Sequence, residues 1–224
     1  MIYLIGLILL LLMAFIWIGI FFVKTSLFPK VMSLEDTLTY EIEHQSFNKK
    51  RYEQMDKQFF TLSSRYGYDL NCIWIDHQKS NKTIILVHGY TVNHQTSLRY
   101  IDLFIDEGYN ILLFDQRFHG ESGGKNCTMG YYEKYDLQDI VTWVKNERGN
   151  DSIVGVHGES MGATTAILHA AIDHRIKFTI ADCAFADLYT QFAYRLKIDY
   201  RLPEFPLLQI ANILAKLIVG VSYK

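Results

Sequence analysis

The sequence predicts an α/β domain with a mostly parallel, doubly wound sheet, preceded by a transmembrane helix. Apolar runs of strand length alternate along the chain with helix-like segments, which is the pattern of a parallel sheet covered by helices on both faces. Three of these runs end in polar, glycine-containing turns, and in such sheets ligands bind beyond the carboxyl ends of the strands. No charged side chain precedes Lys24, so the first segment is apolar throughout.

The apolar N-terminal run is long enough to cross a bilayer, which needs about 20 residues in a helix. A cleaved signal peptide has an apolar core of about 7–15 residues, a basic start and a small-residue cleavage site, and none of these features fits. We therefore expect residues 1–24 to be an uncleaved single-pass anchor in a cell membrane. Lys24 and Lys30 follow the span and favour a cytoplasmic soluble part, but two lysines leave the orientation open.

Residues 25–57 are predicted to form a linker and a helical lead-in, and residues 58–224 to form the α/β domain. The segments QFFTLSS and RYGYDLNCIWIDHQ are typical of an antiparallel strand pair with Gly67 near its turn. The runs KTIILVHGY, YNILLFDQRF, SIVGVHG and KFTIADCAF predict buried parallel strands. Helices are expected near residues 96–107 and 133–148 and over MGATTAILHAAI.

Composition removes several classes of function. A length of 224 residues suits one domain with a large core, and a net charge of −2 without a basic patch argues against nucleic acid as a partner. Cys72, Cys127 and Cys183 are scattered, so they predict neither a metal site nor a disulfide framework. No Gly-x-Gly-x-x-Gly follows the first strand and no phosphate-loop lysine motif occurs, which disfavours a nucleotide binder. We expect neither a cofactor nor a metal.

The stretch Gly158-Glu159-Ser160-Met161-Gly162 carries the strongest indication of chemistry. A serine hydroxyl becomes a useful nucleophile only when it is exposed, held still and given a base. A sharp turn from strand to helix exposes and fixes the serine, and glycines two residues on either side let the backbones approach. The alternative is an ordinary glycine-rich turn. Because a strand is predicted before Ser160 and a helix after it, the nucleophile is the favoured interpretation.

An acyl-transfer site also needs backbone N–H groups directed at the oxyanion. Met161, directly after the serine, would supply one, and Tyr90, after His88-Gly89, would supply the other if the two strands are neighbours. His88 itself stands at the end of a buried strand, where a structural histidine is more common than a catalytic one.

The segments LVHGY, FDQRFHGES and GVHGESMGATTA, in this order, resemble the α/β-hydrolase superfamily. The nearest branch is that of membrane-anchored bacterial hydrolases grouped with serine aminopeptidase-like and Bem46-like proteins. The resemblance covers about residues 59–185. It implies esterase, thioesterase, lipase or peptidase chemistry on a small acyl or peptide substrate, with an acyl-enzyme on Ser160. It further implies that Asp115, Arg117, His119 and Gly120 form a structural, pocket-forming loop outside the triad.

The sequence departs from this family after the nucleophile, where the acid and then the histidine should follow on later strands. Only His169 and His174 follow Ser160, and both belong to the helix that leads away from it. Asp182 is a possible acid, although capping or closing a turn is its favoured role, and Asp187 is the other acid in that region.

The segment after Asp187 predicts helices broken by Pro203 and Pro206. Residues 207–221 are apolar with one narrow polar stripe, which suits a lid or buried helix and is short for a second span. We therefore expect a C-terminally truncated chain, a sheet incomplete at that edge and an activity in doubt. The alternative function is a non-catalytic protein of the same fold that binds an acyl ligand or a partner.

Overall fold

The structure is a computed structural model that describes residues 1–77 and 80–224. The chain divides into two compact units, one made of Lys30–Ala184 and the other of Met1–Pro29 together with Phe185–Lys224. The boundaries expected from the sequence, at residues 24 and 57, stay a prediction.

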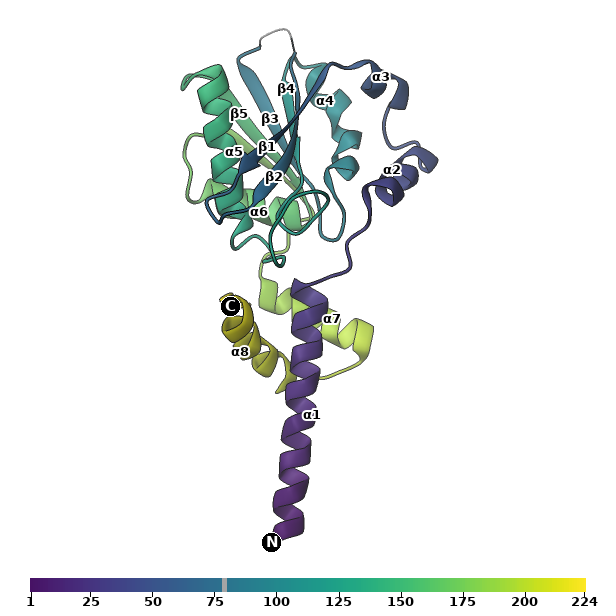
Figure 1. Ribbon diagram of the computed structural model, residues 1–224, viewed down its shortest axis with the longest axis vertical. Coiled ribbons are helices and arrows are strands. Elements are labelled where there is room, and N and C mark those ends of the chain that lie inside the picture. The colour runs from purple at the N-terminus through teal and green to yellow at the C-terminus, as the bar shows by residue number, and fades with distance from the viewer. Residues whose placement is uncertain (78–79) are drawn as a thin grey trace. The chain divides into compact units, whose positions relative to one another are not determined.

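The larger unit is built on a mixed sheet, coloured blue to green in Figure 1. Within the described residues the sheet has six strands in the order β1-β2-β4-β3-β5-β6. Its strands are β1 (Lys57–Ser63), β2 (Asp69–Ile75), β3 (Lys82–Val87), β4 (Asn110–Phe114), β5 (Ile153–Glu159) and β6 (Phe178–Asp182). β4, β3, β5 and β6 run parallel, whereas β2 is antiparallel to both β1 and β4. The predicted fold class, including the antiparallel pair at the start, is confirmed.

The antiparallel pair turns at Gly67, whose φ of 79° lies in the left-handed region that favours glycine. The predicted second strand of this pair extended to Gln78, which lies outside the described residues. Phe59 on β1 remains largely exposed, while β2 is buried from Cys72 to Ile75.

Helices cover both faces of the sheet in Figure 1. They are α2 (Leu34–Glu43), α3 (Lys49–Gln54), the 3₁₀ helix η1 (His94–Tyr100), α4 (Ile101–Ile105), α5 (Glu133–Arg148) and α6 (Met161–Ala170). The helix expected at 96–107 therefore begins two residues earlier and opens as a 3₁₀ turn. The side chain of Asn93 caps this turn by accepting a hydrogen bond from the N–H of Gln95, a local interaction that sets the start of the helix.

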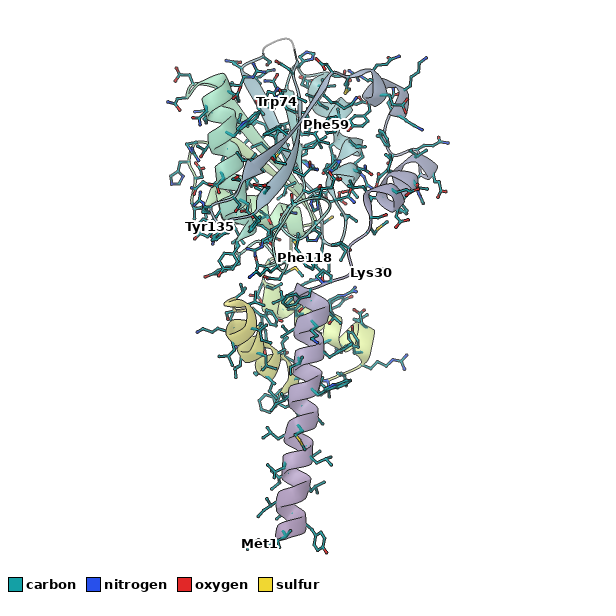
Figure 2. The ribbon with its side chains drawn as sticks, viewed as in Figure 1. Met1, Lys30, Phe59, Trp74, Phe118 and Tyr135 are labelled. Carbon is teal, nitrogen blue, oxygen red and sulfur yellow. The ribbon has the colours of Figure 1, made fainter. Side chains whose placement is uncertain are left out.

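The first face of the sheet packs against α5 and α6. Leu137, Ile140 and Val141 of α5 are fully buried against the β-strand side chains of this face. Trp74, labelled in Figure 2, meets Trp143 edge to face with 5.4 Å between the ring centroids. The alternation of side chains along each strand sends the neighbouring residues to the opposite face.

The second face packs against η1 and α4. Ile84 and Leu86 of β3 meet Leu98 and Ile101, and Leu38 of α2 packs at the edge of this cluster. The helix that follows the apolar N-terminus therefore contributes to the core of the larger unit.

A buried carboxylate joins the β1–β2 hairpin to the start of α5. Asp136 accepts hydrogen bonds from the hydroxyl of Ser64 at 2.5 Å and from that of Tyr68 at 2.6 Å. Burial nevertheless raises the pKa of Asp136 from 3.8 to about 6, because desolvation of the charged form outweighs these two bonds.

The smaller unit contains α1 (Ile2–Leu27), α7 (Leu188–Tyr200) and α8 (Leu207–Val219). The last third of α1 packs on α8 at Gly19, where a Cβ would lie 2.9 Å from the side chains of Ile210 and Leu214. Ser26 and Tyr223 are hydrogen-bonded through their hydroxyls at 3.2 Å. Pro203 and Pro206 lie between α7 and α8, as the sequence predicts.

The first half of α1 is exposed, including Met1, which is labelled in Figure 2. Among the described helices, α1 has the length and apolar composition of a membrane span, and an N-terminal signal sequence has the same properties. α8, with 13 residues, is shorter than a span requires.

The carboxyl of Asp136 makes stability depend on pH. Because its pKa is raised in the folded state, its contribution to folding is complete below pH 3.8 and is lost as the pH rises through about 6. We expect the wild-type chain to lose up to about 3 kcal/mol over this range, at 1.36 kcal/mol per pKa unit, and Asp136→Asn to lose much less. Urea unfolding followed between pH 4 and 7 measures this difference. Asp139→Asn, at the surface pair with Arg65, is the matched control and should keep the wild-type slope.

Candidate active site

Ser160 occupies the turn between β5 and α6 with φ 54° and ψ −115°. This backbone conformation is sparsely populated for any residue other than glycine, and such strain clusters at functional sites. The serine is exposed, while Met161 beside it is fully buried. The turn thus holds one hydroxyl outward on a rigid support.

Two glycines make this turn possible. A Cβ on Gly158 would lie 2.2 Å from the carbonyl oxygen of Gly162, and one on Gly162 would lie 2.1 Å from that of Val87. Real side chains do not tolerate such distances to backbone atoms. The spacing of the glycines around Ser160 therefore allows α6 to start against the end of β3.

The neighbouring strands fix the turn from both sides. The N–H of Ser160 donates to the carbonyl oxygen of Asp182, at the end of β6, at 2.8 Å. On the β3 side, a Cβ on Gly89 would lie 3.6 Å from the Cβ of Ser160. β3 is paired with β5, which is the condition under which the sequence placed Tyr90 beside the serine.

The N-terminus of α6 contributes a favourable electrostatic field. The first N–H groups of a helix have no partner within the helix and carry the positive end of its dipole. Met161 is the first residue of α6, so its N–H belongs to this group. The loop at Gly89 and the start of α6 thus lie on the two sides of Ser160.

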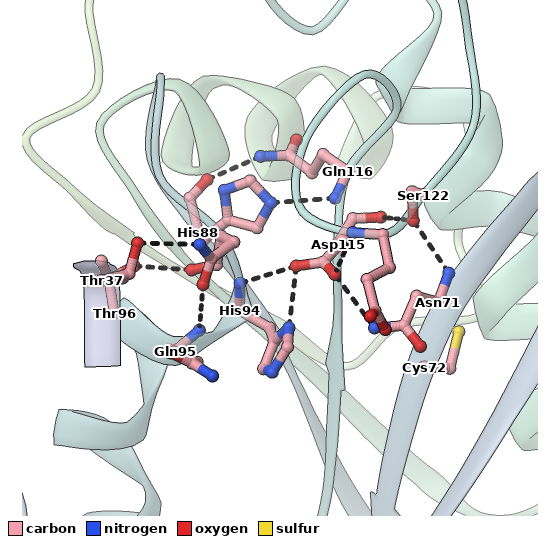
Figure 3. Close-up of polar contacts among 12 residues, drawn as sticks. Thr37, Asn71, Cys72, His88, His94, Gln95, Thr96, Asp115, Gln116 and Ser122 are labelled. Atoms are coloured by element: carbon pink, nitrogen blue, oxygen red, sulfur yellow. Dashed lines mark hydrogen bonds and ion pairs between the residues drawn. The ribbon is translucent and has the colours of Figure 1, made fainter. Parts of the chain in front are cut away.

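Asp115, predicted to lie in a structural loop, is fully buried at the end of β4. Figure 3 shows its carboxylate accepting hydrogen bonds from the backbone N–H and Nδ1 of His94, each at 2.8 Å, and from the Asn71 amide at 3.0 Å. Burial by itself would raise the pKa of Asp115, but the hydrogen bonds from His94 and Asn71 and the neighbouring imidazoles together outweigh it and keep the pKa below its usual range. A Cβ on Gly120 would overlap the same carboxylate. These contacts hold the loop in place.

His88 and His119 are structural in their contacts. His88 donates from Nδ1 to the carbonyl oxygen of Gly89 at 2.8 Å. Figure 3 shows its Nε2 accepting from the N–H of Gln116 at 2.9 Å. Burial lowers the pKa of His88 to about 3, so the ring is neutral at pH 7. His119 uses Nε2 to accept from the N–H of Thr91 and Nδ1 to donate to Arg117. Neither ring has a nitrogen left to accept the proton of a serine.

The side chains of the remaining residues considered for the triad make other contacts. His169 is buried toward the end of α6, with Nε2 3.3 Å from Asp173, and His174 follows beyond the helix. Asp182 accepts a hydrogen bond from the hydroxyl of Tyr100 at 3.3 Å, and Asp187 caps α7. Among the described residues, no imidazole is hydrogen-bonded to Ser160 or to Asp182.

A cavity of about 400 Å³ opens beside Ser160, and sequence reasoning missed several of the residues around it. Glu41 of α2 is fully buried and pairs with Arg99 of η1, whose Nη1 lies 3.8 Å from Glu159. The cavity is lined by Met32, Thr37, Tyr40, Glu41, Gly89, Tyr90, Val92, Thr96, Arg99, Glu159 and Ser160. No motif marked Glu41 or Arg99, because they come together only through packing of the lead-in helix on the domain.

The fold and this turn define the class of protein. A mostly parallel sheet in this strand order, a strained serine between a strand and a helix, and a glycine loop beside it are the features of an α/β hydrolase. A family model described as X-Pro dipeptidyl-peptidase (S15 family) matches residues 34–208, and the chain belongs to this family.

Three relatives illustrate the range of this similarity. Protein YqkD of Bacillus subtilis is 44% identical over 206 residues, which are 91% of this chain and 68% of that protein. The Pyrococcus furiosus esterase Pf2001 has a TM-score of 0.62 at 33% identity, over 77% of this chain and 67% of the esterase. The thiohydrolase aneE of Aspergillus aculeatus is 29% identical over 110 residues, covering 47% of this chain and 35% of that enzyme.

These similarities confirm the α/β-hydrolase superfamily that the three motifs predicted, and they make the chain a hydrolase of the esterase/peptidase type. The chain spans about two thirds of the length of the first two relatives and about one third of the third. The narrower branch and the truncation expected from the sequence stay predictions.

The close approach at Gly162 can be tested by adding one methyl group. We expect Gly162→Ala to lower the free energy of unfolding by about 1–3 kcal/mol, because the methyl group meets backbone that cannot rotate away. Urea unfolding measured by tryptophan fluorescence reports this loss. Gly6→Ala, where an added Cβ meets nothing within 4 Å, is the control. An unchanged midpoint for Gly162→Ala would contradict the packing described.

Proposed function

We propose that this protein is a serine hydrolase that forms an acyl-enzyme on Ser160. The observation that carries the proposal is the strained, exposed serine at the β5–α6 turn, with the Gly89 loop on one side and the start of α6 on the other. In the proposed reaction the Ser160 oxygen adds to an acyl carbonyl and its proton passes through a base to the leaving alcohol, thiol or amine. The bond from the carbonyl carbon to that group breaks, and water later hydrolyses the acyl-enzyme. The N–H groups of Tyr90 and Met161 stabilise the oxyanion, and one such donor is worth about 2.7–4 kcal/mol in other enzymes.

The proposed substrates are small esters, thioesters or peptides. The names of the relatives, an esterase, a thiohydrolase and the dipeptidyl-peptidase family, support this range of acyl compounds. Met32, Tyr40 and Val92 give the cavity apolar surface for an acyl group, while its charged residues are paired through Arg99. The cavity therefore suits an acyl group of modest size.

The mechanism also requires a general base that takes the proton of the Ser160 hydroxyl. A serine without its base retains only residual catalysis over water, supplied by the oxyanion hole and by binding. Because His88 and His119 use both ring nitrogens, we propose that the base is not one of these two residues. Asp182 is the possible acid, while its backbone carbonyl, which accepts the N–H of Ser160, agrees with its favoured role of closing a turn.

A second function is favoured by one observation. Among the described residues no imidazole is hydrogen-bonded to the Ser160 hydroxyl, which suits a non-catalytic protein that binds an acyl ligand in the same cavity. The two functions differ in whether Ser160 forms a covalent bond.

The nucleophile can be tested with a fluorophosphonate probe on the full chain in detergent. We expect slow labelling that is lost in Ser160→Ala, together with a several-fold increase in rate when imidazole is added as an external base. Labelling that persists in Ser160→Ala would contradict the role of Ser160. An absence of labelling with and without imidazole would favour the binding protein.

We also propose that residues 1–24 anchor the protein in a membrane, on the length and apolar composition of α1. The full chain should then stay in the membrane fraction after alkaline carbonate extraction. A variant with Leu9→Lys and Leu12→Lys should be released, because each lysine at the centre of a span costs about 2.5–3.5 kcal/mol. Release of the unaltered chain by carbonate would contradict the anchor.

A further inference from the structure

The segment that follows the apolar helix is bonded to the loop beside the nucleophile. The N–H of Met32 donates to the carbonyl oxygen of Thr91 at 2.8 Å. The fully buried amide of Asn93 donates to the hydroxyl of Thr37, also at 2.8 Å, and lies 3.3 Å from the carbonyl oxygen of Ser33. The same Asn93 caps η1, so one side chain joins α2, the loop after β3 and the start of η1.

A second connection runs from α2 to the residue before Ser160. The carboxylate of Glu41 is fully buried and accepts hydrogen bonds from Nη2 of Arg99 and from the hydroxyl of Ser46. Nη1 of Arg99 lies 3.8 Å from Glu159, whose other carboxylate oxygen accepts from Tyr100 at 3.2 Å. A carboxylate buried like Glu41 is stable only when it is paired, so Arg99 is held in one orientation.

The bonds of Asn93 and the ion pairs of Arg99 reach the two parts of the site that must be rigid, the oxyanion loop and the turn at Ser160. Asn93 holds the loop of residues 89–93, which carries Tyr90, and Arg99 holds Glu159 at the turn of Ser160. The same α2 residues, Thr37, Tyr40 and Glu41, form one wall of the cavity beside the serine.

We propose that the segment Lys30–Glu43 is a working part of the active site, in which Asn93 and Arg99 are positioning residues held by Thr37 and Glu41. The segment fixes the oxyanion loop and the nucleophile turn, and it closes one side of the acyl cavity. The inference rests on the proposed function for its catalytic consequence. Oxyanion donors act because they are placed in advance, and a misplacement of about 1 Å can cost about 10²-fold in rate.

The test uses conservative variants in the full chain. Thr37→Val removes the nearest of the three acceptors of the Asn93 amide while keeping the shape of the side chain. Glu41→Gln and Arg99→Met each remove one charge of the ion pair, and the double variant Glu41→Gln/Arg99→Met removes both. Comparing the three separates the effect of the pairing from the effect of each side chain. Arg65→Met, which removes an ion pair with Asp139 remote from the cavity, is the matched control.

Two readouts are taken for each variant. Fluorophosphonate labelling with added imidazole gives the maximal rate and the half-saturating probe concentration separately. Hydrogen exchange of the peptide covering residues 88–96 reports how firmly the loop is held, and it requires no activity. A failure of the wild type to label would therefore count against the proposed function, while the exchange data would still judge the positioning.

We expect Thr37→Val and Arg99→Met to lower the maximal labelling rate about 10- to 100-fold, with a smaller change in half-saturation, and to speed exchange of residues 88–96. The double variant should regain thermal stability, because no unpaired charge stays buried, without regaining the labelling rate. Arg99→Lys should recover part of that rate. Exchange and labelling equal to those of Arg65→Met in both variants would overturn the proposal, as would full recovery of labelling in the double variant.

Discussion

The turn at Ser160 depends on backbones that approach more closely than any side chain would allow. The start of α6 lies against the last residues of β3, and the glycines at 158 and 162 remove the atoms that would prevent it. At this approach Ser160 adopts a strained conformation, and α6 begins at the next residue. The parallel pairing of β3 with β5, and of β5 with β6, brings the neighbouring strand ends to the same place. The remaining parts of the site are arranged around this one contact.

The loops around the turn are held by buried polar groups. Asp115 satisfies the backbone and imidazole of His94, the amide of Asn71 and the start of the next loop, and His88 joins Gly89 to Gln116. Each of these groups is buried, so loss of a partner would leave an unsatisfied donor or acceptor at a cost of about 1–3 kcal/mol. These hydrogen bonds occupy both ring nitrogens of His88 and of His119. The histidines that look most available in the sequence are therefore the ones committed to structure.

Most of the fold could be predicted from local pattern. Strand and helix periodicities depend on adjacent residues, and α5 begins and ends at the predicted residues. The helix expected at 96–107 begins earlier than predicted, at His94. The side chain of Asn93 caps a 3₁₀ turn there, and hydrophobic periodicity does not reveal such a cap. Of the site, the position of Ser160, the glycines and the strand ends could be predicted, since the turn is five consecutive residues. Glu41 and Arg99 could not, because 58 residues separate them and no periodic pattern joins them.

The sequence by itself determined the hydrolase superfamily, the mostly parallel, doubly wound fold class, the strand-to-helix turn at Ser160 and the apolar helix at the N-terminus. Each of these follows from residue types at short spacing, where the physical chemistry is local. Only the tertiary structure decided which polar side chains meet. It committed both ring nitrogens of His88 and His119 to backbone groups, and it placed α2 against the loop beside the serine. Those outcomes depend on the path of the whole chain, because a buried hydrogen bond forms only where folding brings its donor and acceptor together.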